Sequence, residues 1–111
     1  MFTATQQGAV NVIAGNDAVI EASLDDISRV FDECLNVGQP RIVLNLAEVP
    51  LFDSAGLEWL LDSVERCTER GGRLQIAAAN GLCRDILRIT GVSEQFEQFD
   101  DVRDAVRSFT R

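Results

Sequence analysis

The chain contains no histidine, no lysine and no tyrosine, so every basic residue is an arginine. Histidine and lysine are the usual bases that activate a serine or cysteine nucleophile, and that kind of catalysis has no partner residue here. A Schiff base and a phosphate-loop lysine are excluded for the same reason. A catalytic pair of carboxylates stays conceivable, but no two acidic residues stand out. We therefore expect a protein with no catalytic residues, no cofactor and no metal.

Cysteine is scarce as well. Cys34, Cys67 and Cys83 lie far apart and form no C-x-x-C motif. An odd number at this spacing fits neither a disulfide framework nor a zinc site, and buried free thiols in a reducing cytoplasm are the simple interpretation. No apolar run approaches the ~20 residues of a membrane span, and no basic residue precedes Arg29. We expect a cytoplasmic protein with no targeting segment and no membrane insertion.

Positive charge is also in short supply. The chain has 18 acidic and 10 basic residues, a net charge of −8. Proteins that bind nucleic acid need a basic surface to displace counterions from the phosphates, so DNA, RNA and anionic membranes are poor partners. A basic protein surface would be attracted instead, unless the charge only keeps the chain soluble.

The apolar residues that are present predict one α/β domain over residues 1–111. The apolar fraction of 46% and the charged fraction of 25% are ordinary for a globular chain of this length. Apolar periodicity predicts alternating strands and helices, which implies crossover connections and a mostly parallel central sheet with an N-terminal β-hairpin and about four helices. The strands are expected at residues 2–6, 9–14, 41–49, 73–80 and 94–99, and the helices at 24–35, 57–67, 82–90 and 102–109.

Three details of this assignment are open to test. Ser23 is expected to cap the first helix, with Asp26 completing a weak capping box. Leu82, Ile86 and Ile89 are expected to face inward from the third helix. Residues 18–22 are ambiguous between a strand extension and a loop.

The sequence Asp53-Ser54-Ala55-Gly56 lies where the 41–49 strand gives way to a helix. Ligands of open α/β sheets collect at the carboxyl ends of strands. A plain helix cap by Asp53 or Ser54 is one interpretation. Gly56 costs ~1 kcal/mol in a first helical turn, so it needs a reason of its own. That reason is either a bare backbone that lets another chain approach Ser54 or tight packing inside this protein.

Ser54 lacks the features of a hydrolase nucleophile. Glycines do not flank it as G-x-S-x-G requires, and no histidine is available to take its proton. A hydroxyl displayed for another protein to bind or modify is the remaining functional interpretation.

The stretch RIVLNLAEVPLFDSAGLEWLL resembles the signature of the STAS family, which is named for sulfate transporters and anti-sigma-factor antagonists. The likeness extends from about residue 9 to 107 and includes GGRLQIAAAN and ILRITGV. It implies the α/β fold described above. The matching signature residues are Asn45, Leu46, Asp53, Ser54, Ala55, Gly56 and Leu57.

By this resemblance, Ser54 corresponds to the family's phosphoacceptor serine and Asp53 to the acidic residue before it. The resemblance implies a partner that is both an anti-sigma factor and a serine kinase. The unmodified protein would bind this partner and free a sigma factor, phosphorylation would end the binding, and a serine phosphatase would restore it. We expect Asp53, Ser54, Ala55 and Gly56 to contact the partner.

Trp59 and Asp17 complete the expected partner surface. Trp59 lies off the apolar stripe of its helix, so it is either an exposed anchor for a partner or a side chain packed on the helix at 82–90. The family has G-[EQ]-[LI]-D after its second strand, and Gly15 and Asp17 of AGNDAVIEASL match that motif only in part.

Two other functions stay open. The partial loop motif favours a scaffold or a subunit of a larger complex, stressosome-like or associated with lipid transport, in which Ser54 is not phosphorylated. The other alternative is a small enzyme or ligand-binding domain, which would need a pocket beside residues 15–18 and 53–56.

Overall fold

The computed structural model describes residues 1–35 and 38–110. Their strands form one five-stranded sheet in the order β1-β2-β3-β4-β5. The β1–β2 pair is antiparallel and each later pair is parallel, so the predicted fold class is confirmed. The strands are β1 (Phe2–Gln7), β2 (Val10–Gly15), β3 (Arg41–Asn45), β4 (Arg73–Ala77) and β5 (Gln98–Phe99).

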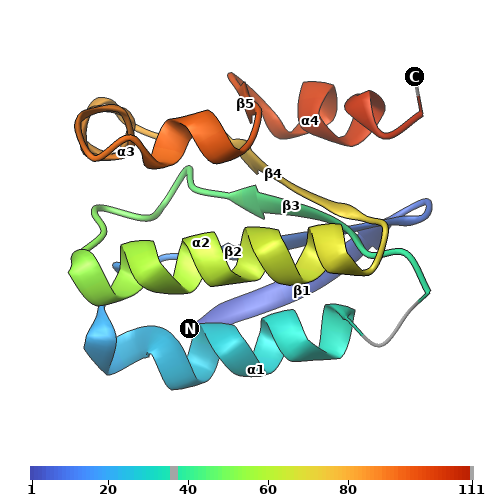
Figure 1. Cartoon of the computed structure of the whole chain (residues 1–111), viewed down its shortest axis with the longest axis horizontal. Helices are drawn as coiled ribbons and strands as arrows, with labels where there is room; N and C mark the ends of the chain where they lie inside the picture. Colours follow the sequence, from blue (N-terminus) through green and yellow to red (C-terminus); the bar gives the residue numbers. More distant parts are fainter. Residues whose placement is uncertain (36–37, 111) are drawn as a thin grey trace.

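Helices cover both faces of the sheet (Figure 1). One face carries α1 and α2, and the other carries α4, which packs on β3, β4 and β5. The helices of the described residues are α1 (Leu24–Cys34), α2 (Ser54–Glu69), α3 (Gly81–Ile89) and α4 (Val102–Ser108), with short 3-10 turns η1 (Glu21–Ser23) and η2 (Val92–Gln95). None of the described helices is long and apolar enough to cross a membrane.

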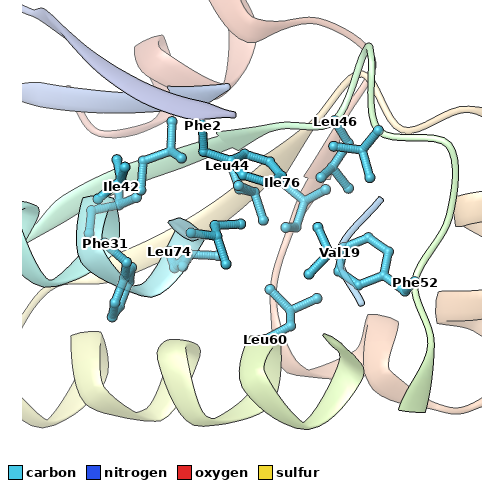
Figure 2. Packing of buried hydrophobic residues seen from close by; sticks show 14 of the residues in the cluster. Phe2, Val19, Phe31, Ile42, Leu44, Leu46, Phe52, Leu60, Leu74 and Ile76 are labelled. Atoms are coloured by element: carbon cyan, nitrogen blue, oxygen red, sulfur yellow. The ribbon is translucent and has the colours of Figure 1, made fainter. Parts of the chain in front are cut away.

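The core is divided by the sheet. The larger cluster lies between the sheet and the α1–α2 layer, where Phe31, Leu44 and Leu60 are fully buried (Figure 2). The smaller cluster joins Val43 of β3 to Ala105 of α4 on the opposite face. Because β3 is covered on both faces, its apolar residues run consecutively rather than alternating.

The structure corrects three predicted strand lengths, among them that of β4, which ends at Ala77 instead of residue 80. β3 ends at Asn45 instead of residue 49, and the Asn45 side-chain oxygen accepts the Ala47 N–H at 3.0 Å, which turns the chain. Only residues 98–99 of the predicted 94–99 strand are extended in the sheet, because η2 takes up residues 92–95.

Two predictions about helices are wrong. The Ser23 hydroxyl makes no capping bond to α1. It accepts the Ile20 N–H at 3.1 Å and donates to the Ala18 carbonyl at 2.6 Å, while Asp26 accepts the Phe2 N–H at 2.7 Å. In α3, Leu82 and Ile89 are exposed and Cys83 and Leu87 are buried. In so short a helix the apolar residues lie on two adjacent faces, so their spacing alone does not show which face is buried.

The three cysteines are free and buried, as predicted. Burial raises the pKa of the Cys34 and Cys83 thiols and raises the pKa of Cys67 to about 12. Such thiols are protonated at neutral pH, so they act as core side chains rather than as nucleophiles.

Candidate functional site

Ser54 is the first residue of α2, and it is exposed. Asp53 precedes it as the N-cap residue in an extended conformation, and its Oδ1 accepts the Gly56 N–H at 2.7 Å. Asp53 therefore caps the helix, and the Ser54 hydroxyl forms no hydrogen bond with any described residue. Because this hydroxyl neither caps the helix nor bonds another described residue, it is available to another molecule.

Asp53 also holds a segment that lies far from it in the sequence. Its Oδ2 accepts the Glu21 N–H at 3.1 Å, across 32 residues. The Asp53 N–H donates to the Val19 carbonyl at 3.3 Å, and the Val19 N–H donates to the Leu51 carbonyl at 3.0 Å. We call residues 19–21 the crossing segment. It fixes the start of α2 against the body of the domain, so Ser54 sits on a rigid support.

The carboxylate of Asp53 is kept ionised by these bonds. The Gly56 N–H first and the Glu21 N–H second lower the pKa of Asp53 below its ordinary value of 3.8. A fixed negative charge therefore lies immediately before the Ser54 hydroxyl at neutral pH.

Gly56 is buried beneath the crossing segment. A Cβ at this position would lie 1.9 Å from the Val19 carbonyl oxygen. Figure 2 shows Val19 beside Phe52 and above Leu60 of α2. The expectation that Gly56 exposes a bare backbone to a partner is wrong, because Val19 covers it; tight internal packing is the reason for the glycine.

Trp59 is half-buried and packs on α1. Its ring meets Phe31 edge-on, with centroids 5.7 Å apart and an interplanar angle of 76°. The Arg66 guanidinium lies 5.4 Å from the same Phe31 ring. The alternative in which Trp59 packs on the helix at 82–90 is thus wrong, since this side of α2 faces α1. A partner contact by the exposed part of Trp59 stays a prediction.

Asp17 and Ala55 flank the site. Ala55 is half-exposed on the first turn of α2. Asp17 is exposed, forms an ion pair with the Met1 amino group, and lies two residues before the crossing segment. A hollow of about 360 Å³ is lined by Asp17 and Asp26, and Ser54 does not line it. The roles of Asp17 and Ala55 toward a partner are untested.

Leu51 and Leu82 are apolar side chains near the site that sequence reasoning missed. They are 37% and 53% exposed, respectively. Asn80, the N-cap of α3, donates from Nδ2 to the Val49 carbonyl at 3.1 Å, so the start of α3 lies beside the loop that leads to Ser54. Apolar spacing predicts Leu82 on the inward face, and no signal in the sequence marks it as exposed.

This arrangement is an exposed surface. It combines an exposed hydroxyl, a fixed carboxylate and two exposed leucines at the carboxyl end of the sheet. No group of three or more potential metal-ligating side chains occurs among the described residues. Fold and site together define a small α/β domain with an exposed serine hydroxyl at the start of a helix.

The model of the STAS domain matches residues 2–105, and the chain belongs to this family. A curated relative from Thermotoga maritima, with the provisional name anti-sigma factor antagonist, is 27% identical over 82 residues, covering 74% of this chain and 73% of that protein.

Solved structures agree in fold. The crystal structure of a provisionally named anti-sigma factor antagonist from Thermotoga maritima has a TM-score of 0.91 at 22% identity, covering 99% of this chain and 95% of that one. The phosphorylated form of SpoIIAA, a cell fate determinant of Bacillus, has a TM-score of 0.73 at 14% identity, covering 98% of this chain and 99% of that one.

Proposed function

We propose that this chain is a non-enzymatic anti-sigma factor antagonist switched by phosphorylation of Ser54. The unmodified chain binds an anti-sigma factor that is also a serine kinase. Phosphorylation by that kinase ends the binding, and a serine phosphatase restores it in the cytoplasm. The observation that carries the proposal is the exposed, unbonded Ser54 hydroxyl on a helix end whose capping is done by Asp53.

The chemistry of the site favours an electrostatic switch. A phosphate adds about −1.5 to −2 charges at neutral pH. On Ser54 it would adjoin the Asp53 carboxylate, which stays ionised because two N–H groups bind it. A docked interface accommodates such a dianion only with cationic partners, so the charge favours release.

The rigid start of α2 explains how phosphorylation of one residue would be enough to end partner binding. The crossing segment and the Asp53 cap hold the start of α2 from two sides. The free and modified chains would then differ mainly in surface charge, without an internal rearrangement. Leu51 and Leu82, both exposed beside this end, would supply apolar contact area to the partner.

Substitution of Ser54 tests the switch. We expect Ser54→Asp to weaken binding to the anti-sigma factor of the same organism at least about tenfold, or 1.4 kcal/mol, in titration calorimetry. Ser54→Ala keeps the charge of the unmodified site and is expected to bind as the wild type does. Unchanged affinity of Ser54→Asp would overturn the proposal.

The partly matching loop at residues 15–18 supports a second candidate, a scaffold or complex subunit that uses the same surface with Ser54 unmodified. Mass spectrometry of the protein purified from its own host distinguishes the two. Phosphate on Ser54 supports the switch. A partner that stays bound to Ser54→Asp, together with an unmodified Ser54 in every growth condition, supports the scaffold.

A further inference from the structure

A small polar hollow lies at the amino ends of β3 and β4. Its volume is about 200 Å³, and it is lined by Gln39, Arg41, Gly71, Gly72, Arg73 and Phe109. Arg41 and Arg73 are the first residues of the two strands and are register partners in the sheet. Ser54 follows the carboxyl end of β3, so the hollow and the candidate site lie at opposite ends of the sheet.

The two arginines lie on the same face of the sheet. The Arg73 guanidinium is 5.2 Å from the centre of the Phe109 ring and donates to the Ser108 carbonyl at 3.5 Å, so it lies on the α4 side. Arg41 precedes by two residues Val43, which packs against α4, and therefore shares that side. Neighbouring strands are about 4.8 Å apart. Two like charges at this spacing are unfavourable unless an anion compensates them.

The described residues supply no such anion. No acidic residue lines the hollow, and the Arg41 guanidinium forms no hydrogen bond or ion pair with any described residue. Elsewhere on the chain, four arginines each pair with a carboxylate: Arg29, Arg66, Arg84 and Arg88. With 18 acidic residues against 10 basic ones, an uncompensated pair of neighbouring arginines points to an anion from outside the chain.

The backbone around the hollow is fixed. The Arg73 N–H donates to the Pro40 carbonyl at 3.0 Å, and a Cβ on Gly72 would lie 1.9 Å from the same carbonyl oxygen. The turn before β4 therefore packs directly on the residue before β3. The Gln39 side-chain amide lies against Gly71, at the edge of the hollow. Because the backbones of both arginines are held in place, less ordering is needed when a ligand binds.

A second hollow adjoins the first. Its volume is about 420 Å³, it shares Gln39 and Arg41 with the first hollow, and none of its lining residues is acidic. Gln6 and Asn11 add two carboxamide side chains, which both donate and accept hydrogen bonds. This hollow has room for the body of a small polar molecule whose charged group lies on the arginines.

We propose that Arg41 and Arg73 bind a phosphate group, which accepts hydrogen bonds from both guanidinium groups. A phosphate monoester carries about −1.5 to −2 charges at neutral pH and offers oxygens to two arginines, whereas a carboxylate carries a single charge. The phosphate group is that of inorganic phosphate or of a small ester whose body lies in the second hollow. This proposal does not depend on the Ser54 switch.

Titration of the isotope-labelled protein with sodium phosphate at constant ionic strength tests the proposal. We expect saturable shifts of the side-chain N–H resonances of Arg41 and Arg73. Arg41→Gln is expected to weaken binding about tenfold. As a control, Arg103→Gln removes the same charge from an exposed residue that lines neither hollow and pairs with no described carboxylate, and it is expected to bind as the wild type does.

A parallel titration with ribose 5-phosphate distinguishes the two sources of the phosphate group. Tighter binding than that of inorganic phosphate, with shifts of the Gln6 and Asn11 side-chain amides, supports the proposal and assigns a phosphate ester. Equal affinity without those shifts supports it and assigns free phosphate.

Three results would overturn the proposal. Equal weakening by Arg41→Gln and Arg103→Gln would mean attraction by net charge alone. Shifts centred on residues 53–56, or shifts that do not saturate, would exclude a site at the arginines. Without phosphate, Arg41→Gln should unfold in urea at the same midpoint as the wild type or a higher one, because it relieves the repulsion. A clearly lower midpoint would mean that Arg41 is compensated within the fold.

Discussion

At the scale of single residues, Gly56 is where steric and conformational effects oppose each other most directly. Replacing a helical glycine with alanine normally gains about 1 kcal/mol. Here the new Cβ would lie 1.9 Å from the Val19 carbonyl, a backbone atom held by the Asp53 N–H. We expect overpacking to prevail, so that Gly56→Ala lowers the free energy of unfolding by about 1 to 3 kcal/mol. Urea unfolding followed by circular dichroism measures this change.

Gly81 provides the matched control, because it is the first residue of α3 and a Cβ there would meet nothing within 4 Å. Gly81→Ala is expected to leave stability unchanged or slightly raised. If Gly56→Ala were as stable as Gly81→Ala, the crossing segment would not be packed on α2 as the structure shows.

At the scale of elements, Asp53 joins the crossing segment to the start of α2. Its two carboxylate oxygens accept the N–H groups of Glu21 and Gly56. We expect Asp53→Ala to speed hydrogen exchange at both amides, while amides of the central strand, such as that of Val43, exchange as before. Exchange measured by nuclear magnetic resonance resolves each amide.

Asp101→Ala is the control for this prediction. Asp101 caps α4 by accepting the Asp104 N–H at 2.8 Å, and no hydrogen bond from a distant segment to its carboxylate is seen among the described residues. Its loss should speed exchange only within α4. Faster exchange at Gly56 with an unchanged Glu21 amide would mean that the crossing segment is held without Asp53.

The same elements show how much of the fold can be predicted from the sequence. The order of strands and helices followed from apolar periodicity, because each long element has one buried stripe or two buried faces. The crossing segment stayed ambiguous because its partners, Phe52 through one bridge and Asp53 through the Glu21 N–H, lie more than 30 residues away in the sequence. The buried face of α3 was assigned wrongly, since Leu82 and Ile89 fit the spacing but face solvent.

The sequence predicted the position of the candidate site, but it did not predict the role of each residue in that site. The start of a helix after a buried strand predicted where Ser54 would lie. Which residue caps, which packs and which remains free depends on contacts with Val19 and Glu21, more than 30 residues earlier. Trp59 likewise needed Phe31 of a neighbouring helix for its placement. Local patterns carry no information about such partners.

At the scale of the whole molecule, the absence of histidine sets the pH dependence of stability. No side chain has an ordinary pKa near 6.5, and burial raises the pKa of all three thiols. The unmodified chain is therefore expected to show constant stability between about pH 5.5 and 7.

Below about pH 5.5, two carboxylates account for most of the expected loss of stability. The Phe2 N–H lowers the pKa of Asp26, and the N–H groups of Gly56 and Glu21 lower the pKa of Asp53. Protons then bind the unfolded chain before the folded one, so this stabilisation is present above the ordinary pKa of 3.8 and disappears as the pH falls through the lowered values. Both residues join distant segments, β1 to α1 and the crossing segment to α2, so acid should loosen tertiary contacts first.

Urea midpoints measured from pH 7 to pH 2.5 at constant ionic strength would show a plateau followed by an acid decline. The variant Asp26→Asn/Asp53→Asn removes both titrating groups and should show a lower plateau with a shallower decline. The exposed pair Asp25→Asn/Asp62→Asn removes the same charge and should keep the slope of the wild type. A step near pH 6.5 in the unmodified chain, or equal slopes in all three proteins, would contradict the assignment of acid sensitivity to these two carboxylates.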